Sequence, residues 1–409
     1  MTSTTYTLAW RNIWRHPRRT LLTISAMVFA DVLLVFMLGL QLGQYRMMID
    51  NSLALVSGQM QVQVAGYLDD PQMYRSIPEA DQLAVQIRKA IDLEAVSPRA
   101  YGFALVSSEK RTLGVQISGV EPYYEQLIST IPGLISSGRY LSSASANEAV
   151  IGSTLARNLK LAAGDELTLL GSGRDGSMAA AVLPVVGIFN TGNREIDRQI
   201  IAIPLNSFRQ IFSMGNDAHS IIIGGQRDRE EQYKKAISTL IKDRDKLVLL
   251  DWETLLPGLK QVIEADFFSA WFMYAVLIIL VAFSMLNTIL MSVLERTHEF
   301  GILLALGVRH SKLGRIILTE STLLALTGMV IGIVAGSLLT FYFSKTGISY
   351  PGMEEMSARF NLPPLILPEV SLRTVIPGPL AVFLASVLSS LYPVWHMRKL
   401  NPVQAMQAA

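Results

Sequence analysis

The sequence predicts an α+β membrane protein with four transmembrane helices and a mixed α+β extracytoplasmic domain between helices 1 and 2. Four apolar runs carry this prediction, because a helix needs roughly 20 consecutive apolar residues to cross a bilayer. The composition agrees: 50% of the 409 residues are hydrophobic and only 17% are charged, against about 25% charged in an average soluble domain. Between the first two runs the apolar stretches become short and turn residues frequent, which indicates a folded domain outside the membrane.

Composition and motifs exclude several kinds of chemistry. The net charge of +2 is too small to favour a nucleic-acid partner, and the absence of cysteine excludes disulfides, thiolate metal sites and cysteine nucleophiles. The sequence contains no P-loop, no His-Glu-x-x-His and no Gly-x-Ser-x-Gly. Gly171–Gly176 fits Gly-x-Gly-x-x-Gly, but β-like residues follow where a dinucleotide site needs a helix. We therefore expect a loop between two strands there, and no metal, cofactor or catalytic residue in this chain.

Residues 1–20 are predicted to form a cytoplasmic amphipathic helix that lies in the membrane interface. Tyr6, Trp10, Ile13 and Trp14 recur at helical spacing, and arginines lie off that stripe. A basic helix with tryptophans on its apolar side is typical of an interfacial helix. A soluble helix that packs on a core is the alternative. The candidate interface residues are Trp10, Arg11, Trp14, Arg15, Arg18 and Arg19.

Residues 21–43 are predicted as transmembrane helix 1. The run is longer than the roughly 7–15 apolar residues of a signal peptide, and no Ala-x-Ala follows it. A carboxylate in mid-membrane costs at least about 2.5 kcal/mol, so Asp31 should face other helices or water. Asp31 is either a pore-lining or gating group or a structural carboxylate, with Ser284, Asn287 or Thr340 as its partner. Asp31 and Asn287 are the candidate intramembrane polar residues.

Residues 44–266 are predicted as the extracytoplasmic core domain with a stalk. A strand that ends near 152 should run into a helix capped by Ser153. From Pro257 a helix should continue into the second span and so couple that span mechanically to the domain. Periodicity and turn residues predict strands at 59–65, 113–120, 166–170, 181–189, 199–203, 220–223 and 247–250, and helices at 79–91, 206–212 and 230–244.

The charged segment 295–315 separates the predicted transmembrane helices 2 and 3. It is too charged for hydrocarbon and too short for a domain, so we expect a short helix at the membrane surface. Its apolar and small side should comprise Phe300, Leu303, Leu304 and Gly307, and a partner protein could push on it. The predicted bounds are 267–294 for helix 2, 316–343 for helix 3, 344–373 for an extracytoplasmic loop, 374–395 for helix 4 and 396–409 for a cytoplasmic tail.

Basic residues near the ends of the spans predict the orientation, because they favour the cytoplasmic side. They concentrate before helix 1, in the segment 295–315 and after helix 4. The loop 344–373 instead balances its basic residues with acidic ones. We therefore expect both termini and the segment 295–315 in the cytoplasm, and the core domain outside, in the periplasm of a cell with two membranes.

Five parts of the sequence resemble the FtsX-like permeases, which are the membrane subunits of the MacB, LolC/LolE and FtsX class of ABC systems. The likeness covers most of the chain, and Glu299–Gly307 is its most specific part. The parts are Ala9–Thr20, Val150–Leu159 with Gly164 and Asp165, Val186–Gly192 followed by Ile203–Leu205, Glu295–Gly307, and Pro393–Met406.

The resemblance implies a multi-pass protein of the bacterial inner membrane. It implies a homodimer, or a heterodimer with a related permease, to which two copies of a separate ABC ATPase bind on the cytoplasmic side. ATP and Mg²⁺ would then be bound by that ATPase, and this chain would be a non-catalytic subunit. A periplasmic adaptor or a lipoprotein cargo would be a further partner. The implied coupling helix spans 295–308, with Glu295, Arg296, Glu299, Phe300, Gly301, Leu304 and Gly307 as its candidate ATPase-coupling residues.

The expected function is to transmit ATP-driven motion of the ATPase to the periplasmic domain. That motion would export or release a lipoprotein, a lipid or another periplasmic-side substrate. The layout is nearer to LolC/LolE than to MacB, which carries a fused nucleotide-binding domain. One alternative is a membrane-anchored sensor or scaffold without ATPase coupling. Another is an ion-coupled secondary transporter that uses Asp31 as a proton site.

Overall fold

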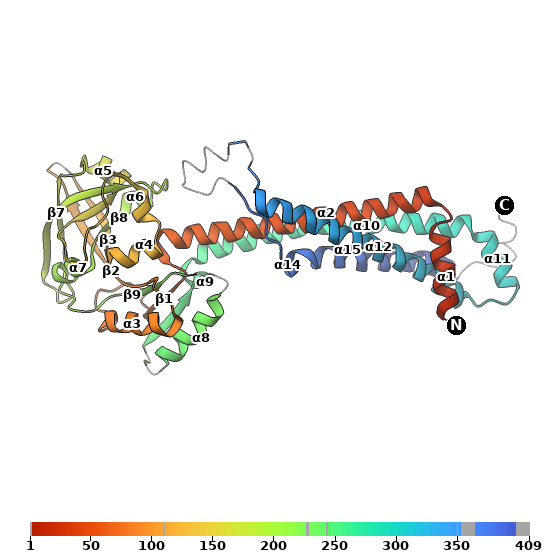
Figure 1. The fold of residues 1–409 in the computed structure, drawn as a ribbon, viewed down its shortest axis with the longest axis horizontal. Helices are drawn as coiled ribbons and strands as arrows, with labels where there is room; N and C mark the ends of the chain where they lie inside the picture. The colour runs from red at the N-terminus through yellow and green to blue at the C-terminus, as the bar shows by residue number, and fades with distance from the viewer. Residues whose placement is uncertain are drawn as a thin grey trace. The chain divides into compact units, whose positions relative to one another are not determined.

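The computed structural model describes residues 2–109, 111–225, 229–242, 244, 246–349, 351–352 and 365–397. The chain divides into two compact units (Figure 1). We call residues 1–46, 262–350 and 365–409 the helical unit, and residues 47–261 with 351–364 the core domain. Each is described by itself.

Among the residues that the structure describes, four helical stretches are long and apolar enough to cross a membrane: Pro17–Leu55, Pro257–Glu295, His310–Thr346 and Leu372–Met397. These four helical stretches, and the mixed α+β domain between the first and the second, confirm the predicted fold class. Figure 1 shows the long helices running alongside one another, with α1 across one end. The helices are α1 (Thr2–Ile13), α2 (Pro17–Ser52), α10 (Pro257–Glu295), α11 (Thr297–Ala305), α12 (His310–Thr346), α14 (Leu372–Val375), α15 (Pro377–Ser389) and α16 (Leu391–Met397).

The N-terminal segment differs from the single helix predicted for residues 1–20. Helix α1 ends at Ile13, residues 14–16 form a turn, and α2 begins at Pro17. Proline fits the first position of a helix, whereas the residue before it is disfavoured in helical conformation, so His16-Pro17 starts a new helix. Thr20 Oγ1 donates to Ile13 O at 2.5 Å and closes the turn. Arg18 and Arg19 therefore belong to α2.

Helices α2 and α10 form an antiparallel pair that polar contacts join along its length. At one end Arg19 Nη1 lies 2.7 Å from Glu295 Oε2, and at the next level Thr23 Oγ1 lies 3.0 Å from Thr288 Oγ1. Toward the other end Tyr274 donates to Gln41 at 2.9 Å, and Tyr45 donates to Asp266 at 2.6 Å. The residue numbers on α10 fall as those on α2 rise, as expected for antiparallel helices. Polar contacts therefore join the two helices at four levels along their length.

Helix α2 also packs closely on α12 through glycines spaced four residues apart. A Cβ on Gly328 would lie 2.9 Å from Met27 Cβ, one on Gly332 would lie 2.4 Å from Asp31 Cβ, and one on Gly336 would lie 3.0 Å from Val35 Cβ. Residues i and i+4 share one helix face, so these glycines form a continuous groove for α2. Close backbone approach through small residues is a common way for membrane helices to associate.

The fourth span is built from short pieces. Helix α14 precedes α15, which starts at Pro377, and α16 follows after Ser390. Prolines at these starts fit the first turn of a helix, where no backbone donor is needed. The predicted loop 344–373 falls partly on residues 353–364, and the predicted tail 396–409 falls mostly on residues 398–409. Both stretches lie outside the described residues.

The core domain contains a ten-stranded sheet, six strands of which close into a ring. The ring order is β2, β3, β8, β5, β7 and β6, and β6 pairs back to β2. Its interior is a buried apolar cluster that includes Phe208 of α7 and Phe212, the residue that follows this helix. The strands of the ring are β2 (Val96–Ser107), β3 (Thr112–Val120), β5 (Ala149–Gly152), β6 (Glu166–Ser172), β7 (Met178–Phe189) and β8 (Ile200–Pro204).

The remaining strands extend the sheet from the ring. β10, β1 and β9 continue it from the start of β2, and α3 and α8 contribute to a second apolar core there, while β4 pairs with β7. β1 runs from Met60 to Val64, β4 from Ile135 to Gly138, β9 from Ser220 to Ile223 and β10 from Leu247 to Asp251. The helices are α3 (Ala80–Ile91), α4 (Pro122–Ile128), α5 (Ser153–Leu159), α6 (Ile196–Gln199), α7 (Leu205–Ile211), α8 (Glu230–Ile241) and α9 (Trp252–Leu255), with a π-turn (Leu53–Ser57) and a 3₁₀ turn (Ile131–Leu134).

The structure confirms the strands and helices predicted for the core domain and adds β2 and β4, which the sequence patterns missed. The Gly-x-Gly-x-x-Gly match covers the end of β6 and most of residues 173–177, which join β6 to β7 in a hairpin as predicted. The prediction for Ser153 was wrong. Ser153 is the first residue of α5 and its hydroxyl donates to Asp197 Oδ2 at 3.1 Å instead of capping the helix.

Candidate functional site

Helix α11 is the predicted coupling helix, and it is anchored to the helical unit by its own buried side. It follows α10 after the single residue Arg296. Phe300 and Gly301 are buried, and Leu304 is half-buried in the same apolar cluster. Positions 300, 301 and 304 share one helix face, which explains why this side faces the other helices.

A glycine ends the helix. Gly307 has φ of +89°, a conformation that glycine adopts without strain. Its N–H donates to Leu304 O and the N–H of Val308 donates to Leu303 O, both at 3.0 Å, which is a Schellman motif. Gly307 was predicted on the apolar and small side of this helix; in the structure it terminates α11 and is exposed.

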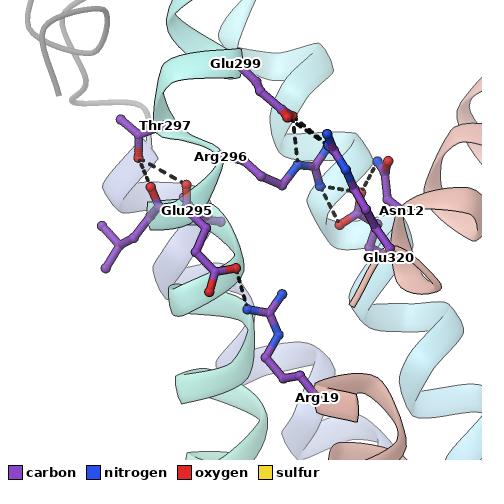
Figure 2. A network of polar contacts seen from close by, with 10 residues as sticks. Asn12, Arg19, Glu295, Arg296, Thr297, Glu299 and Glu320 are labelled. Carbon is purple, nitrogen blue, oxygen red and sulfur yellow. Dashed lines mark hydrogen bonds and ion pairs between the residues drawn. The ribbon is translucent and has the colours of Figure 1, made fainter. Parts of the chain in front are cut away.

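The strongest anchor of this region is an ion pair between Arg296 and Glu320 of α12. Arg296 Nη1 lies 3.1 Å from Glu320 Oε1 and 3.3 Å from Oε2, and the side chains are only 14% and 10% exposed. Asn12 of α1 donates to the same Glu320 Oε1 at 2.6 Å. Figure 2 shows the three side chains converging from α1, α12 and the α10–α11 junction. The Arg296 guanidinium also lies 5.0 Å from the Phe300 ring centroid.

Two further ion pairs join the predicted interface arginines to the predicted coupling glutamates. Arg15 Nη1 lies 2.8 Å from Glu299 Oε1, and Arg19 Nη1 lies 2.7 Å from Glu295 Oε2. Glu299 also lies 3.4 Å from Arg296 Nε, so it joins the α1–α2 turn to the buried pair (Figure 2). We call these contacts, together with Arg296, Glu320 and Asn12, the anchor network. It ties α11 to α1, α2 and α12.

A small cavity of about 30 Å³ lies beside the anchor network. Asn12, Arg19, Arg296 and Glu320 belong to its polar lining, and hydroxyl and apolar side chains supply the rest. A space of this size holds about one water molecule, and water needs two or more polar partners to be stable there. The lining supplies those partners.

The outer side of α11 is apolar and exposed. Ile302 and Leu303 are exposed, and Leu306 is 77% exposed. We call these three residues the coupling face. Leu303 was predicted on the same side as Phe300, and positions three apart are indeed neighbours on a helix, but packing buries Phe300 and leaves Leu303 exposed. Apolar residues grouped at a membrane surface beside charges mark a candidate protein contact.

The predicted interface residues lie on α1, in the turn that follows it and at the start of α2. Trp10 and Trp14 are half exposed and their rings meet edge to face with centroids 6.2 Å apart, whereas Ala9 and Ile13 are buried. Arg11 and Arg18 are exposed. Trp10 and Trp14 are thus free to lie in a lipid interface, while Arg15 and Arg19 belong to the anchor network.

The structure does not bring Asp31 and Asn287 together. Asp31 is fully buried against Gly332, and neither of its carboxylate oxygens accepts a hydrogen bond from the residues that the structure describes. Ser284 and Asn287 are exposed on α10, and Thr340 donates to Gly336 O at 2.7 Å. The predicted partners were therefore wrong, because Asp31 lies on the side of α2 that faces α12.

Sequence reasoning missed two members of the anchor network, Asn12 and Glu320. A signal for Glu320 existed, since an acidic residue near the start of an apolar run requires a partner. Asn12 gave no such signal, because a polar residue in an amphipathic helix is ordinary. Within the described parts of the chain, no group of three or more His, Asp or Glu side chains is placed to hold a metal ion.

Comparison with known proteins agrees with this architecture. Residues 20–240 match the MacB-like periplasmic core domain, and residues 271–402 match the FtsX-like permease C-terminal family. The first match covers more than half of the chain, and the second includes α11 and the whole of α12.

Full-length relatives span both matched regions. The lipoprotein-releasing system transmembrane protein LolC of Xylella fastidiosa is 20% identical over 78% of this chain and 80% of its own length. An uncharacterized ABC transporter permease of Methanocaldococcus jannaschii is 24% identical over 98% and 97%. The periplasmic region of MacB from Actinobacillus actinomycetemcomitans is 16% identical, with a TM-score of 0.36 over 52% of this chain and 94% of that one. The chain belongs to the ABC transporter permeases of the FtsX/MacB/LolC class, with a MacB-like periplasmic core domain and an FtsX-like permease C-terminal region.

Proposed function

We propose that this permease transmits ATP-driven motion of a separate ABC ATPase to its periplasmic core domain. The observation that carries the proposal is the construction of α11. One side of this helix is fixed to α1, α2 and α12 by Phe300 and the anchor network, while the coupling face stays exposed. A push on that face therefore reaches three other helices through contacts that are already formed.

The pairing of α2 and α10 supports the next step. Polar contacts hold the pair at four levels, from Arg19–Glu295 to Tyr45–Asp266. Both helices are continuous across the boundary between the helical unit and the core domain, at residues 46–47 and 261–262. A continuous, cross-bonded helix pair moves as one body, so a displacement at α11 is carried along it.

We further propose that α11 and both termini lie in the cytoplasm of a bacterial inner-membrane protein. The contacts of Arg15 and Arg19 with Glu299 and Glu295 support this, because they hold the two basic segments at one end of the helices. ATP and Mg²⁺ are then bound by the ATPase dimer, and this chain acts as a non-catalytic subunit of a homodimer or heterodimer. It binds no nucleic acid.

For the cargo we propose a chemical class and not a specific molecule. A relative is named for lipoprotein release, which supports a lipoprotein, a lipid or another periplasmic-side substrate. In this scheme the core domain, with or without a periplasmic adaptor, moves the cargo away from the membrane. The membrane spans then need no continuous channel.

The test is substitution of the coupling face. Leu306→Ser and Ile302→Ser remove exposed apolar side chains without opening the buried core, unlike a change at Phe300. Each should lower co-purification of the ATPase and the stimulation of its ATP hydrolysis. Leu127→Ser, at an exposed leucine of α4 in the core domain, is the matched control and should change neither. Unchanged ATPase binding and stimulation in the Leu306→Ser, Ile302→Ser double variant would show that α11 is not the coupling helix.

A further inference from the structure

A polar pocket on the core domain lies apart from the anchor network and the coupling face. It has a volume of about 920 Å³ and opens between β4, α5 and the loop 190–195 that follows β7. The loop and the start of α5 are two of the segments that gave the family resemblance. Neither the fold nor the proposed coupling needs the charges that line this pocket.

Asp197 lines the pocket, but both of its carboxylate oxygens accept hydrogen bonds from neighbouring residues. Its Oδ1 accepts from the N–H of Thr191 at 3.0 Å and from the Thr191 hydroxyl at 2.7 Å, and its Oδ2 accepts from Ser153 at 3.1 Å. The residue is buried. Both oxygens are therefore occupied, and the carboxylate joins the loop 190–195 to the start of α5.

A glycine lets the two segments approach so closely. A Cβ on Gly152 would lie 2.2 Å from Asp197 O, which no side chain tolerates. The backbone of β5 thus lies directly against α6, and the position of the pocket wall is fixed by the fold.

Three cationic side chains line this pocket without acidic partners. Arg157, Lys160 and Arg194 form no ion pair with any carboxylate in the part of the chain that the structure describes, and all three are exposed. Arg157 Nη2 donates to Thr154 Oγ1 at 3.1 Å. Other arginines of this domain are paired, such as Arg99 with Glu125 at 2.7 Å and Arg209 with Asp81 at 2.8 Å.

The two asparagines of the lining add hydrogen-bond donors. Asn190 Oδ1 accepts from Gly192 N–H, and Asn193 Oδ1 accepts from Glu195 N–H, both at 3.0 Å. These bonds fix each amide with its oxygen toward the loop, so each NH₂ group remains as a donor. The one exposed carboxylate of the lining, that of Glu195, accepts from Gln199.

We propose that this pocket binds an oxyanion of the phosphate class, either inorganic phosphate or a phosphate ester on a larger molecule. Guanidinium groups match phosphate oxygens with paired hydrogen bonds, and such charge-assisted bonds are stronger than neutral ones. Arg157 of α5 and Arg194 of the loop 190–195 supply two guanidinium groups, Lys160 adds a third charge, and the amides of Asn190 and Asn193 complete the donor set. This assignment rests on the proposed function: in a permease whose core domain handles a periplasmic-side substrate, this site recognises the anionic part of that substrate or of a lipid headgroup.

The experiment is a titration of the full-length chain in a neutral detergent, followed by calorimetry. The probes are inorganic phosphate, glycerol 3-phosphate and dihexanoyl phosphatidylglycerol below its micelle concentration, with chloride at matched ionic strength as the blank. Saturable binding at millimolar concentration or tighter is expected. Binding of phosphate alone assigns the site to the free ion, and binding of the lipid diester assigns it to a headgroup.

Substitutions then locate the site. Arg157→Gln and Arg194→Gln should each weaken binding about tenfold, the loss expected for removing a charged hydrogen-bond partner. Arg198→Gln is the matched control, because Arg198 is exposed on the same domain and lies outside this pocket. Its affinity should be unchanged, and all three variants should keep the thermal midpoint of the parent. Absence of saturable binding in the parent, or an equal loss in Arg198→Gln, overturns the proposal.

Discussion

Arg296 and Glu320 lie 24 residues apart and form a largely buried ion pair, with Arg296 Nη1 3.1 Å from Glu320 Oε1. The pair joins the end of α10 to α12, and Asn12 of α1 bonds to the same carboxylate. The carboxylate of Glu320 therefore holds together three separate segments of the chain, namely α1, the α10–α11 junction and α12. The position of α11 is set by this contact more than by the exposed pairs around it.

Removing Glu320 should destabilise the helical unit much more than removing an exposed glutamate. Glu320→Ala leaves the Arg296 charge with only Glu299 in a largely dry site, and breaking a buried pair costs about 3 kcal/mol. Glu295→Ala breaks an exposed pair with Arg19, which is worth less than about 1 kcal/mol. Thermal unfolding of the purified chain in detergent measures both. Equal shifts in the two midpoints would mean that the Arg296–Glu320 pair carries no special share of stability.

A disulfide between α2 and α10 should leave function intact. Thr23 Oγ1 and Thr288 Oγ1 are 3.0 Å apart, so cysteines at these positions are close enough to oxidise. The natural chain has no cysteine, and Thr23→Cys with Thr288→Cys therefore gives one unambiguous cross-link. Because the two helices move as one body in the proposed mechanism, ATPase stimulation should be the same with and without reductant. Stimulation that returns only after reduction would show that the helices must separate or slide.

The glycine groove of α12 should not tolerate a methyl group. Gly332→Ala places a Cβ 2.4 Å from Asp31 Cβ, and overpacking of this kind costs about 1–3 kcal/mol. Gly258→Ala is the control, because no atom lies within 4 Å of an added Cβ at that helical glycine. Alanine also favours a helix over glycine by about 1 kcal/mol, so Gly258→Ala should be neutral or stabilising. Thermal midpoints that fall equally for both would contradict the packing of α2 on α12.

Acid should destabilise the core domain through His219. The side chain is fully buried; its Nδ1 accepts from Tyr101 N–H at 2.9 Å, and its Nε2 lies 3.3 Å from Met73 O. Burial lowers the pKa of His219 from 6.5 to about 4, and the positive charge of Arg174 acts in the same direction. The folded imidazole therefore stays neutral down to about pH 4, whereas the unfolded one takes up a proton below pH 6.5.

The His219 contribution is thus complete above pH 6.5 and is lost as the pH falls toward 4. The loss is of the order of 3 kcal/mol over that window. In urea unfolding of the full chain followed at several pH values, His219→Gln should be less stable at pH 7 and should lose less stability between pH 7 and 4 than the parent. A parallel decline in both proteins would remove His219 as the cause.

Much of this fold follows from patterns that are local in the sequence. The lengths of the apolar runs identify α2, α10 and α12, and alternation identifies strands such as β1 and β7. The break before Pro17 was also readable, since proline starts helices and restricts the residue before it. The prediction of one helix over residues 1–20 gave too much weight to periodicity and too little to that rule.

The candidate site was less accessible to such patterns, because its contacts join distant parts of the chain. Glu320 shows as a charge in an apolar run, but nothing local identifies Arg296 and Asn12 as its partners. Likewise the sequence does not say which side of α2 faces α12, and the partners predicted for Asp31 followed from position along the membrane alone. Phe300 and Leu303 appeared equivalent as apolar residues, and only packing separates the anchor from the exposed face.

The central claim is that a separate ABC ATPase works through this chain, and recovery of the intact complex tests it most directly. The full-length chain would be purified from its own cells in several mild detergents, and the proteins that accompany it would be identified and quantified by mass spectrometry. The account predicts an ABC ATPase in stoichiometric amount, which the Leu306→Ser, Ile302→Ser double variant loses and the Leu127→Ser control retains. Recovery of the chain without any ATPase in every detergent would contradict it and would favour a membrane-anchored sensor or scaffold.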